Sequence, residues 1–268
     1  MGCRAEALFG LGQSVWFDAL GRGLIVSGEL ARLRDEDGVV GVTSNPTIFE
    51  KSIREGKEYA DEIARLAAAG ASATDIYEAL AFGDIRAACD LLGPVYERTH
   101  GVDGVVSIEV SPHLARDTRG TIAEGRSLWG RIGRDNLYIK VPATPEGIPA
   151  IRALIADGIS VNVTLIFSVE AYGDVMRAYI EGLEERAALG LPLSGVRSVA
   201  SFFVSRVDTV IDKRLAEIIA RAAAASTADE KARAEKLVGV AAVANARLAY
   251  ARFKNVFSGA RWEALAAK

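Results

Sequence analysis

The sequence predicts an α/β protein of the (β/α)8 TIM-barrel type, in which about six of the eight strands are present. Short apolar, β-branched runs alternate with longer segments of helical periodicity. Most of these runs are almost continuously apolar, as is typical of parallel strands that are covered on both faces. Polar side chains are concentrated near the carboxyl ends of the same runs, where enzymes with this fold carry their active sites.

Six runs are predicted to be strands, and helical segments lie between them. The predicted strands are Ser14–Asp18, Val39–Ser44, Val105–Val110, Leu137–Val141, Val161–Phe167 and Val196–Val204. Six β-then-α units in succession favour a parallel sheet.

Two of the helical segments each carry one apolar stripe. The stripes are Tyr172, Val175, Met176, Tyr179, Ile180 and Leu183, and Val207, Val210, Ile211, Leu215, Ile218 and Ile219. Their spacing predicts amphipathic helices. Another helix is expected to start at Thr144-Pro145-Glu146, where a hydroxyl cap precedes a proline. The capping-box sequence that runs from Thr227 to Glu230 predicts the start of a long C-terminal helix.

We expect one domain spanning residues 1–268, because no Pro/Ser-rich linker divides the chain. A complete (β/α)8 barrel has eight strands and about 250 residues. Here six strand candidates precede the helical residues Arg261–Lys268. The expected domain is therefore an incomplete barrel whose open sheet edges favour aggregation or pairing with another chain.

Composition and charge exclude several classes of protein. The 268 residues include 32 basic and 35 acidic side chains, a net charge of −3, which argues against a nucleic-acid partner. Cys3 and Cys89 are too few for a disulfide framework, and with His100 and His113 they do not predict a metal site. Apolar runs are too short for a membrane span or a secretory signal, so we expect a cytoplasmic protein without a membrane partner.

Polar side chains interrupt or directly follow the predicted strands near their carboxyl ends. They are Asp18, Asn45, Glu109, Lys140, Asn162, Thr164 and Ser201. Because barrel active sites are built at this end of the strands, these residues are the candidates for chemistry.

Lys140 carries the strongest chemical indication among them. Its neighbours Leu137, Ile139 and Val141 predict a covered strand, and a lysine is rarely buried without a partner. Burial favours the neutral amine, which is nucleophilic and forms Schiff bases with carbonyl substrates. The alternative is a lysine at the strand end that extends its amine into solvent.

The other candidates also have structural alternatives. A lone carboxylate such as Asp18 or Glu109 commonly caps a helix or pairs with a cation. Asn45-Pro46 is a common turn signal, and Arg206 alone suits a helix surface. Together with an amine, however, an acid and a base complete the set that aldol chemistry needs.

Two motifs resemble the signatures of the transaldolase family. Gly41–Ile48 (GVTSNPTI) resembles the first signature, and Leu137–Gly147 (LYIKVPATPEG) resembles the second, whose lysine forms the Schiff base. The resemblance runs from about Leu11 to the end of the chain and is closest to the bacterial form that also occurs fused to phosphoglucose isomerase.

This resemblance implies a transferase of the pentose phosphate pathway. Such an enzyme moves a dihydroxyacetone unit from a ketose phosphate, sedoheptulose 7-phosphate or fructose 6-phosphate, to an aldose phosphate. It uses no metal or organic cofactor, because the lysine imine is the electron sink. The resemblance assigns Lys140 the attack on the ketose carbonyl and Asp18 the removal of the C4 hydroxyl proton. Glu109 and Thr164 correspond to the pair that holds a water for proton transfers.

The remaining residues correspond to substrate-binding groups. Asn45, Asn162 and Ser201 match the groups that hydrogen-bond the three-carbon unit, and Arg206 matches the arginine that binds the phosphate. Family members continue with two further strands that add phosphate-binding side chains. The resemblance thus implies a truncated chain with impaired activity, and it leaves homo-oligomer formation open.

Two other interpretations remain open at this point. A class I aldolase like fructose 6-phosphate aldolase would cleave its substrate without a sugar acceptor, and Asp18 favours the transferase over it. An inactive, truncated fragment is the other interpretation.

Overall fold

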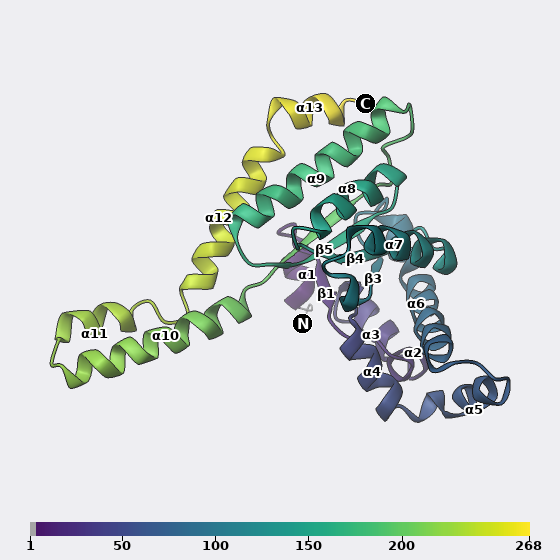
Figure 1. Ribbon diagram of the computed structural model, residues 1–268, viewed down its shortest axis with the longest axis horizontal. Coiled ribbons are helices and arrows are strands. Elements are labelled where there is room, and N and C mark those ends of the chain that lie inside the picture. The colour runs from purple at the N-terminus through teal and green to yellow at the C-terminus, as the bar shows by residue number, and fades with distance from the viewer. Residues whose placement is uncertain (1–3) are drawn as a thin grey trace. The chain divides into compact units, whose positions relative to one another are not determined.

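The computed structural model describes residues 4–268 and confirms the predicted α/β class (Figure 1). Six parallel strands form one sheet in the order β1-β2-β3-β4-β5-β6. They are β1 (Val15–Phe17), β2 (Val39–Thr43), β3 (Val105–Glu109), β4 (Leu137–Pro142), β5 (Val161–Ile166) and β6 (Ser198–Phe202). Helices follow each strand, and this sequential order is that of a (β/α)8 barrel.

The remaining secondary structure of the described residues consists of α-helices and two short 3₁₀ helices. The first half of the chain contains α1 (Arg4–Phe9), α2 (Arg22–Val26), α3 (Glu29–Asp35), α4 (Pro46–Glu55), η1 (Lys57–Tyr59), α5 (Ala60–Ala68), α6 (Ala73–Arg98), η2 (Pro112–Leu114) and α7 (Thr118–Ile132). The second half contains α8 (Gly147–Asp157), α9 (Val169–Ala188), α10 (Ser205–Ala224), α11 (Ala228–Glu235), α12 (Ala241–Val256) and α13 (Ala260–Ala266). All six predicted strands are present, each within two residues of its expected bounds.

The chain forms two compact units, whose boundary crosses β4 after Lys140 and β5 after Val161. The first unit comprises the chain up to Leu114, Arg119–Lys140 and Ile159–Val161. The second comprises Ala115–Thr118, Val141–Gly158 and Asn162–Lys268.

The core of the first unit lies between the sheet and α6. Leu80, Ile85 and Leu92 of α6 are completely buried, as are Val105 of β3 and Leu137 of β4. Burying apolar side chains of this size stabilises the fold by about 1.5–3 kcal/mol each. Among the strands of this unit, α6 packs against β2 and β3.

Replacing Gly104 by alanine is expected to destabilise the fold by about 3 kcal/mol. Gly104 has a φ of +79°, and an added Cβ would lie 2.7 Å from the carbonyl oxygen of Leu92 and closer still to the amide nitrogen of Tyr96. Both are backbone atoms of α6, which cannot rotate away.

Gly70 is the matched control for this substitution. Its φ is +81°, but nothing lies within 4 Å of an added Cβ. Gly70→Ala should therefore lower the free energy of unfolding by about 1 kcal/mol, the cost of placing alanine in the left-handed conformation. Urea unfolding measures the free energy of unfolding of both variants. Equal decreases in Gly104→Ala and Gly70→Ala would contradict the steric explanation.

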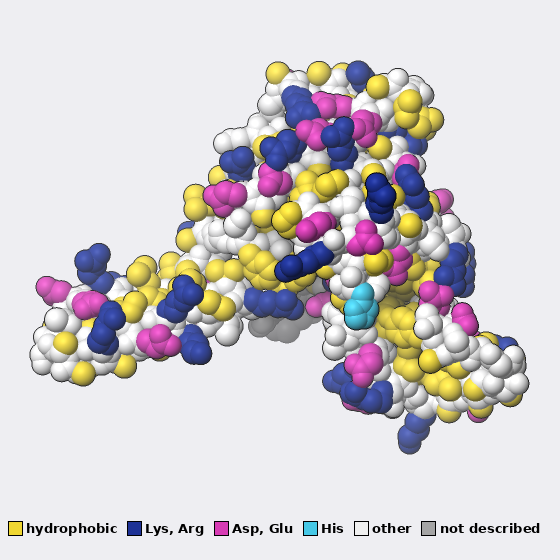
Figure 2. Space-filling view, viewed as in Figure 1, with side chains coloured by type: hydrophobic (Ala, Val, Ile, Leu, Met, Phe, Trp, Pro, Cys, Tyr) yellow, Lys and Arg dark blue, Asp and Glu magenta, His cyan; other side chains and the backbone are white. Residues whose placement is uncertain are grey.

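The second unit is organised around the packing of α8 against α9. Ile151, Leu154 and Ile155 of α8 are completely buried, and Val175 and Met176 of α9 are nearly so. On the outer surface, Arg152 of α8 pairs with Glu181 and Glu185 of α9, and Arg261 of α13 pairs with Glu184. Figure 2 shows both charge signs interspersed on this face.

The predicted start of α8 is displaced by two residues. The helix begins at Gly147, whereas the sequence pattern predicted a first turn at Pro145. The Thr144 hydroxyl does accept the Gly147 N–H, at 2.9 Å, and it donates to the carbonyl oxygen of Ala115 at 2.7 Å. The second bond ties this turn to a segment distant in sequence.

The predicted long C-terminal helix is wrong. The chain instead forms three helices, and α11 ends at Glu235 after 8 residues. The capping box at Thr227 does not form: no side-chain cap hydrogen bond is made there, and the Thr227 hydroxyl instead donates to the carbonyl oxygen of Ala222 at 3.2 Å. A new helix, α12, starts where Asp208 of α10 accepts the N–H of Ala242 at 2.9 Å.

Candidate active site

The amine of Lys140 lies in the interior of the first unit. Every residue of β4 is buried, and Lys140 is 8% exposed. Its Nζ donates to the carbonyl oxygen of Ser44 at 3.2 Å and lies 3.4 Å from Oε2 of Glu109. The side chain therefore does not extend into solvent, the alternative that its position at a strand end left open.

Strand register explains why Glu109 meets Lys140. The two residues are direct Cα partners in the parallel pair of β3 and β4. The N–H of Val110 also donates to the carbonyl oxygen of Lys140 at 3.1 Å, so pairing continues to the end of the strands. Because direct partners on parallel strands point to the same face, the carboxylate is held beside the amine.

The turn after β2 supplies the second partner of Lys140. Ser44 is completely buried, and its hydroxyl donates to the carbonyl oxygen of Ser107 at 2.8 Å. Asn45 is the N-cap of α4, with its Oδ1 accepting the N–H of Ile48 at 3.0 Å. These two bonds and Pro46 at the first helical position set the direction of the Ser44 carbonyl.

Asp18 directly follows β1 and is exposed. Trp16, two residues earlier, packs edge-on against Tyr138 of β4 at a ring-centroid distance of 6.4 Å. Among the described hydrogen bonds and ion pairs, those of Lys140 involve Ser44 and Glu109, and none involves the Asp18 side chain.

The second unit holds the other four predicted residues. Asn162 and Thr164 are buried on the same face of β5, and the Ser201 hydroxyl donates to Oδ1 of Asn162 at 2.9 Å. Arg206 is exposed in the first turn of α10, with its guanidinium carbon 4.6 Å from the centre of the Phe203 ring. The structure thus brings Asn162 and Ser201 together, as it does Lys140 and Glu109 in the first unit.

Sequence patterns missed two features of these strands. The Ser44 carbonyl is a backbone acceptor, for which no residue type is diagnostic. Leu165, next to Thr164, has a φ of +59°. This conformation costs a non-glycine residue about 1 kcal/mol or more.

A cavity of about 270 Å³ in the first unit touches two predicted residues, Asn45 and Glu109. Its wall includes Glu124 of α7, whose carboxylate accepts the N–H of Ser111 at 2.8 Å. Burial raises the pKa of Glu124. The cavity therefore adds a proton-exchanging group near the end of β3.

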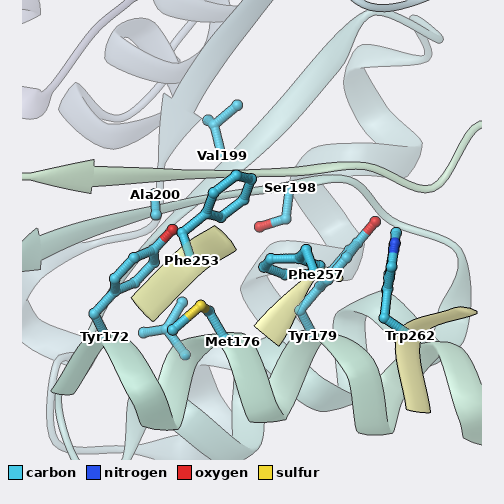
Figure 3. Close-up of a pocket in the computed structure, with 10 residues that line it drawn as sticks. Tyr172, Met176, Tyr179, Ser198, Val199, Ala200, Phe253, Phe257 and Trp262 are labelled. Atoms are coloured by element: carbon cyan, nitrogen blue, oxygen red, sulfur yellow. The ribbon is translucent and has the colours of Figure 1, made fainter. Parts of the chain in front are cut away.

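A larger cavity, of about 540 Å³, lies in the second unit between α9, β6 and α12 (Figure 3). Tyr172, Met176 and Tyr179 of α9 form one side, and Phe253 of α12 and Phe257, which directly follows α12, contribute further rings. Its ionisable groups are the phenols of Tyr172 and Tyr179, and burial raises the pKa of both, that of Tyr172 to about 12. They are therefore poorly matched to acid–base catalysis at neutral pH.

Two further findings concern the described residues as a whole. They contain no group of three or more His, Cys, Asp or Glu side chains placed to hold a metal ion. None of their helices is both long and apolar enough to span a membrane.

The comparisons with known proteins agree on one family. The model of the family "Transaldolase/Fructose-6-phosphate aldolase" matches residues 15–267. The chain is 52% identical over 266 residues to a transaldolase of Thermobifida fusca, covering 99% of this chain and 69% of that protein. It is 49% identical to a transaldolase of Trichodesmium erythraeum, covering 96% of this chain and 67% of the relative. For transaldolase 1 of Streptomyces avermitilis the identity is 51%, covering 97% of this chain and 66% of the relative. The chain thus spans about two thirds of the length of these relatives.

Proposed function

Because the chain belongs to the transaldolase/fructose-6-phosphate aldolase family, we propose that it transfers a dihydroxyacetone unit between sugar phosphates through a Schiff base on Lys140. The observation that carries the proposal is the buried amine of Lys140, 3.4 Å from the Glu109 carboxylate. A nucleophilic amine next to a proton acceptor is what imine formation requires. The donor is a ketose phosphate and the acceptor an aldose phosphate of the pentose phosphate pathway, and we assign the reaction to the cytoplasm.

The proposed reaction begins with attack of Nζ on the C2 carbonyl of the ketose phosphate. The resulting carbinolamine loses its hydroxyl group as water, and the C=N bond of the imine forms. This step requires proton delivery to the departing oxygen and proton removal from nitrogen. We assign these transfers to a water held by Glu109 and Thr164, and the contact between Glu109 and Lys140 supports this.

Cleavage of the sugar follows imine formation. Asp18 takes the proton of the C4 hydroxyl, the C3–C4 bond breaks, and its electron pair enters the protonated imine to give a neutral enamine on Lys140. The shortened aldose phosphate leaves, and the enamine carbon then attacks the aldehyde of the acceptor. Asn45, Asn162 and Ser201 are proposed to hydrogen-bond the three-carbon unit, and Arg206 to bind the phosphate.

A class I aldolase that needs no acceptor is the second candidate, because the matched family includes fructose 6-phosphate aldolase. The acceptor dependence of the reaction separates the two. With fructose 6-phosphate alone, a transferase should stop after one three-carbon unit per Lys140, and erythrose 4-phosphate should restore turnover. Continuous release of free dihydroxyacetone without acceptor would contradict the transferase. The inactive fragment would be indicated by a folded chain, with native circular dichroism and a sharp size-exclusion peak, that shows neither acceptor-dependent turnover nor release of dihydroxyacetone.

A further inference from the structure

The loop between β1 and α2, residues 18–21, carries Asp18. Ser52 of α4 is hydrogen-bonded to this loop, and Tyr59 of η1 and Asp84 of α6 are hydrogen-bonded to Arg22, the first residue of α2. We propose that Ser52, Tyr59 and Asp84 form a clamp that positions this loop, and with it the carboxylate of Asp18, for carbon–carbon cleavage. The inference rests on the proposed role of Asp18 and adds positioning residues to it.

Two hydrogen bonds between side-chain hydroxyls and the main chain form the first part of the clamp. The Ser52 hydroxyl of α4 donates to the carbonyl oxygen of Leu20 at 3.0 Å. The N–H of Arg22 donates to the phenolic oxygen of Tyr59 at 2.7 Å. The main chain is therefore held at two atoms on either side of Gly21.

Gly21 shows how closely the loop approaches α4. A Cβ added there would lie 2.6 Å from Oγ of Ser52 and 3.5 Å from the hydroxyl of Tyr59. Leu20 and Gly21 are both buried. The absence of a side chain at Gly21 thus allows the Ser52 hydroxyl to reach the main chain, whereas the Tyr59 hydroxyl would only touch an added Cβ.

A buried carboxylate orients the clamp. Asp84 of α6 is 2% exposed and accepts the Tyr59 hydroxyl at 2.6 Å and Nε of Arg22 at 2.9 Å. Since that hydroxyl donates its proton to Asp84, its oxygen is directed to accept the Arg22 N–H. Glu62 holds the other side of the guanidinium at 2.5 Å. Burial raises the pKa of Asp84, and the bonds from Tyr59 and Arg22 oppose this.

The position of Asp18 depends on this support. Within the described residues, its side chain has no hydrogen bond or ion pair of its own, so the backbone before and after it sets its place. Before it lies β1, of 3 residues, and after it lies the clamp. A displacement of about 1 Å in a catalytic group can cost about 100-fold in rate.

The test uses Tyr59→Phe and the milder Ser52→Ala in the full chain. We expect both to slow single-turnover cleavage of fructose 6-phosphate by about 10- to 100-fold, while borohydride trapping of the imine on Lys140 stays at the wild-type level. Amide hydrogen exchange in a peptide covering residues 18–24 should accelerate in both. Tyr250→Phe and Ser258→Ala are matched controls, since Tyr250 is exposed and Ser258 also donates to a backbone carbonyl.

A double-mutant cycle separates positioning from general stability. In an Asp18→Ala background, Tyr59→Phe should slow the residual cleavage by less than about twofold. The inference would be overturned if Tyr59→Phe slowed cleavage equally in the wild-type and Asp18→Ala backgrounds, or if amide exchange of residues 18–24 were unchanged. Either result would leave the proposed function intact. An Asp18→Ala variant that cleaves at the wild-type rate would contradict the proposed role of Asp18 and the inference together.

Discussion

Lys140→Arg is expected to abolish both imine formation and turnover, with a loss in kcat of about 10³-fold or more. Arginine keeps the positive charge that Glu109 faces at 3.4 Å, but a guanidinium stays protonated and cannot attack a carbonyl. Borohydride reduction with fructose 6-phosphate should add one sugar mass to the peptide containing Lys140 in the wild-type protein and none in the variant.

Lys213→Arg is the control for this experiment, because Lys213 is an exposed lysine of α10. It should trap the sugar on Lys140 and turn over normally. A label on another lysine, with Lys140 unmodified, would show that the nucleophile has been misidentified. Thermal unfolding of both variants checks that the buried arginine has not simply unfolded the protein.

Removing the two carboxylates is expected to block different steps, each by about 10²- to 10⁴-fold. Asp18→Ala should still form the trapped imine but fail to cleave it, because proton removal from the C4 hydroxyl follows imine formation. Glu109→Ala should slow imine formation itself, since the carboxylate lies beside the amine that becomes the imine nitrogen.

Rapid-quench trapping measures the first step, and release of the aldose phosphate measures the second. Glu217→Ala, an exposed carboxylate of α10, should change neither rate. If Asp18→Ala and Glu109→Ala lose trapping and cleavage in equal proportion, the division of roles between the two carboxylates is incorrect.

The local pattern of the sequence determined the fold class. Apolar runs such as Val105–Val110 and Leu137–Val141 predicted β3 and β4 within one residue, because side-chain periodicity is a property of neighbouring residues. The motifs around Asn45 and Lys140 are local in the same sense, and the family that they indicated is confirmed by the match over residues 15–267. Predictions failed where a distant residue decided the outcome. Asp208, bonded to the N–H of Ala242, starts a new helix where the sequence predicted a continuous one.

The contacts of the candidate site were decided by the tertiary structure. The amine of Lys140 meets a backbone carbonyl 96 residues earlier in the chain, and a backbone acceptor has no signature in the residue types. Arg22 and Asp84 are 62 residues apart, and each alone resembles an ordinary surface charge. Only the packing of α2 against α6 brings half-buried Arg22 to buried Asp84, and Asp84 directs the Tyr59 hydroxyl so that its oxygen accepts the Arg22 N–H. Sequence determines which chemical groups are present and in which elements they lie, but the distances between them follow from strand register and packing across long separations in the chain.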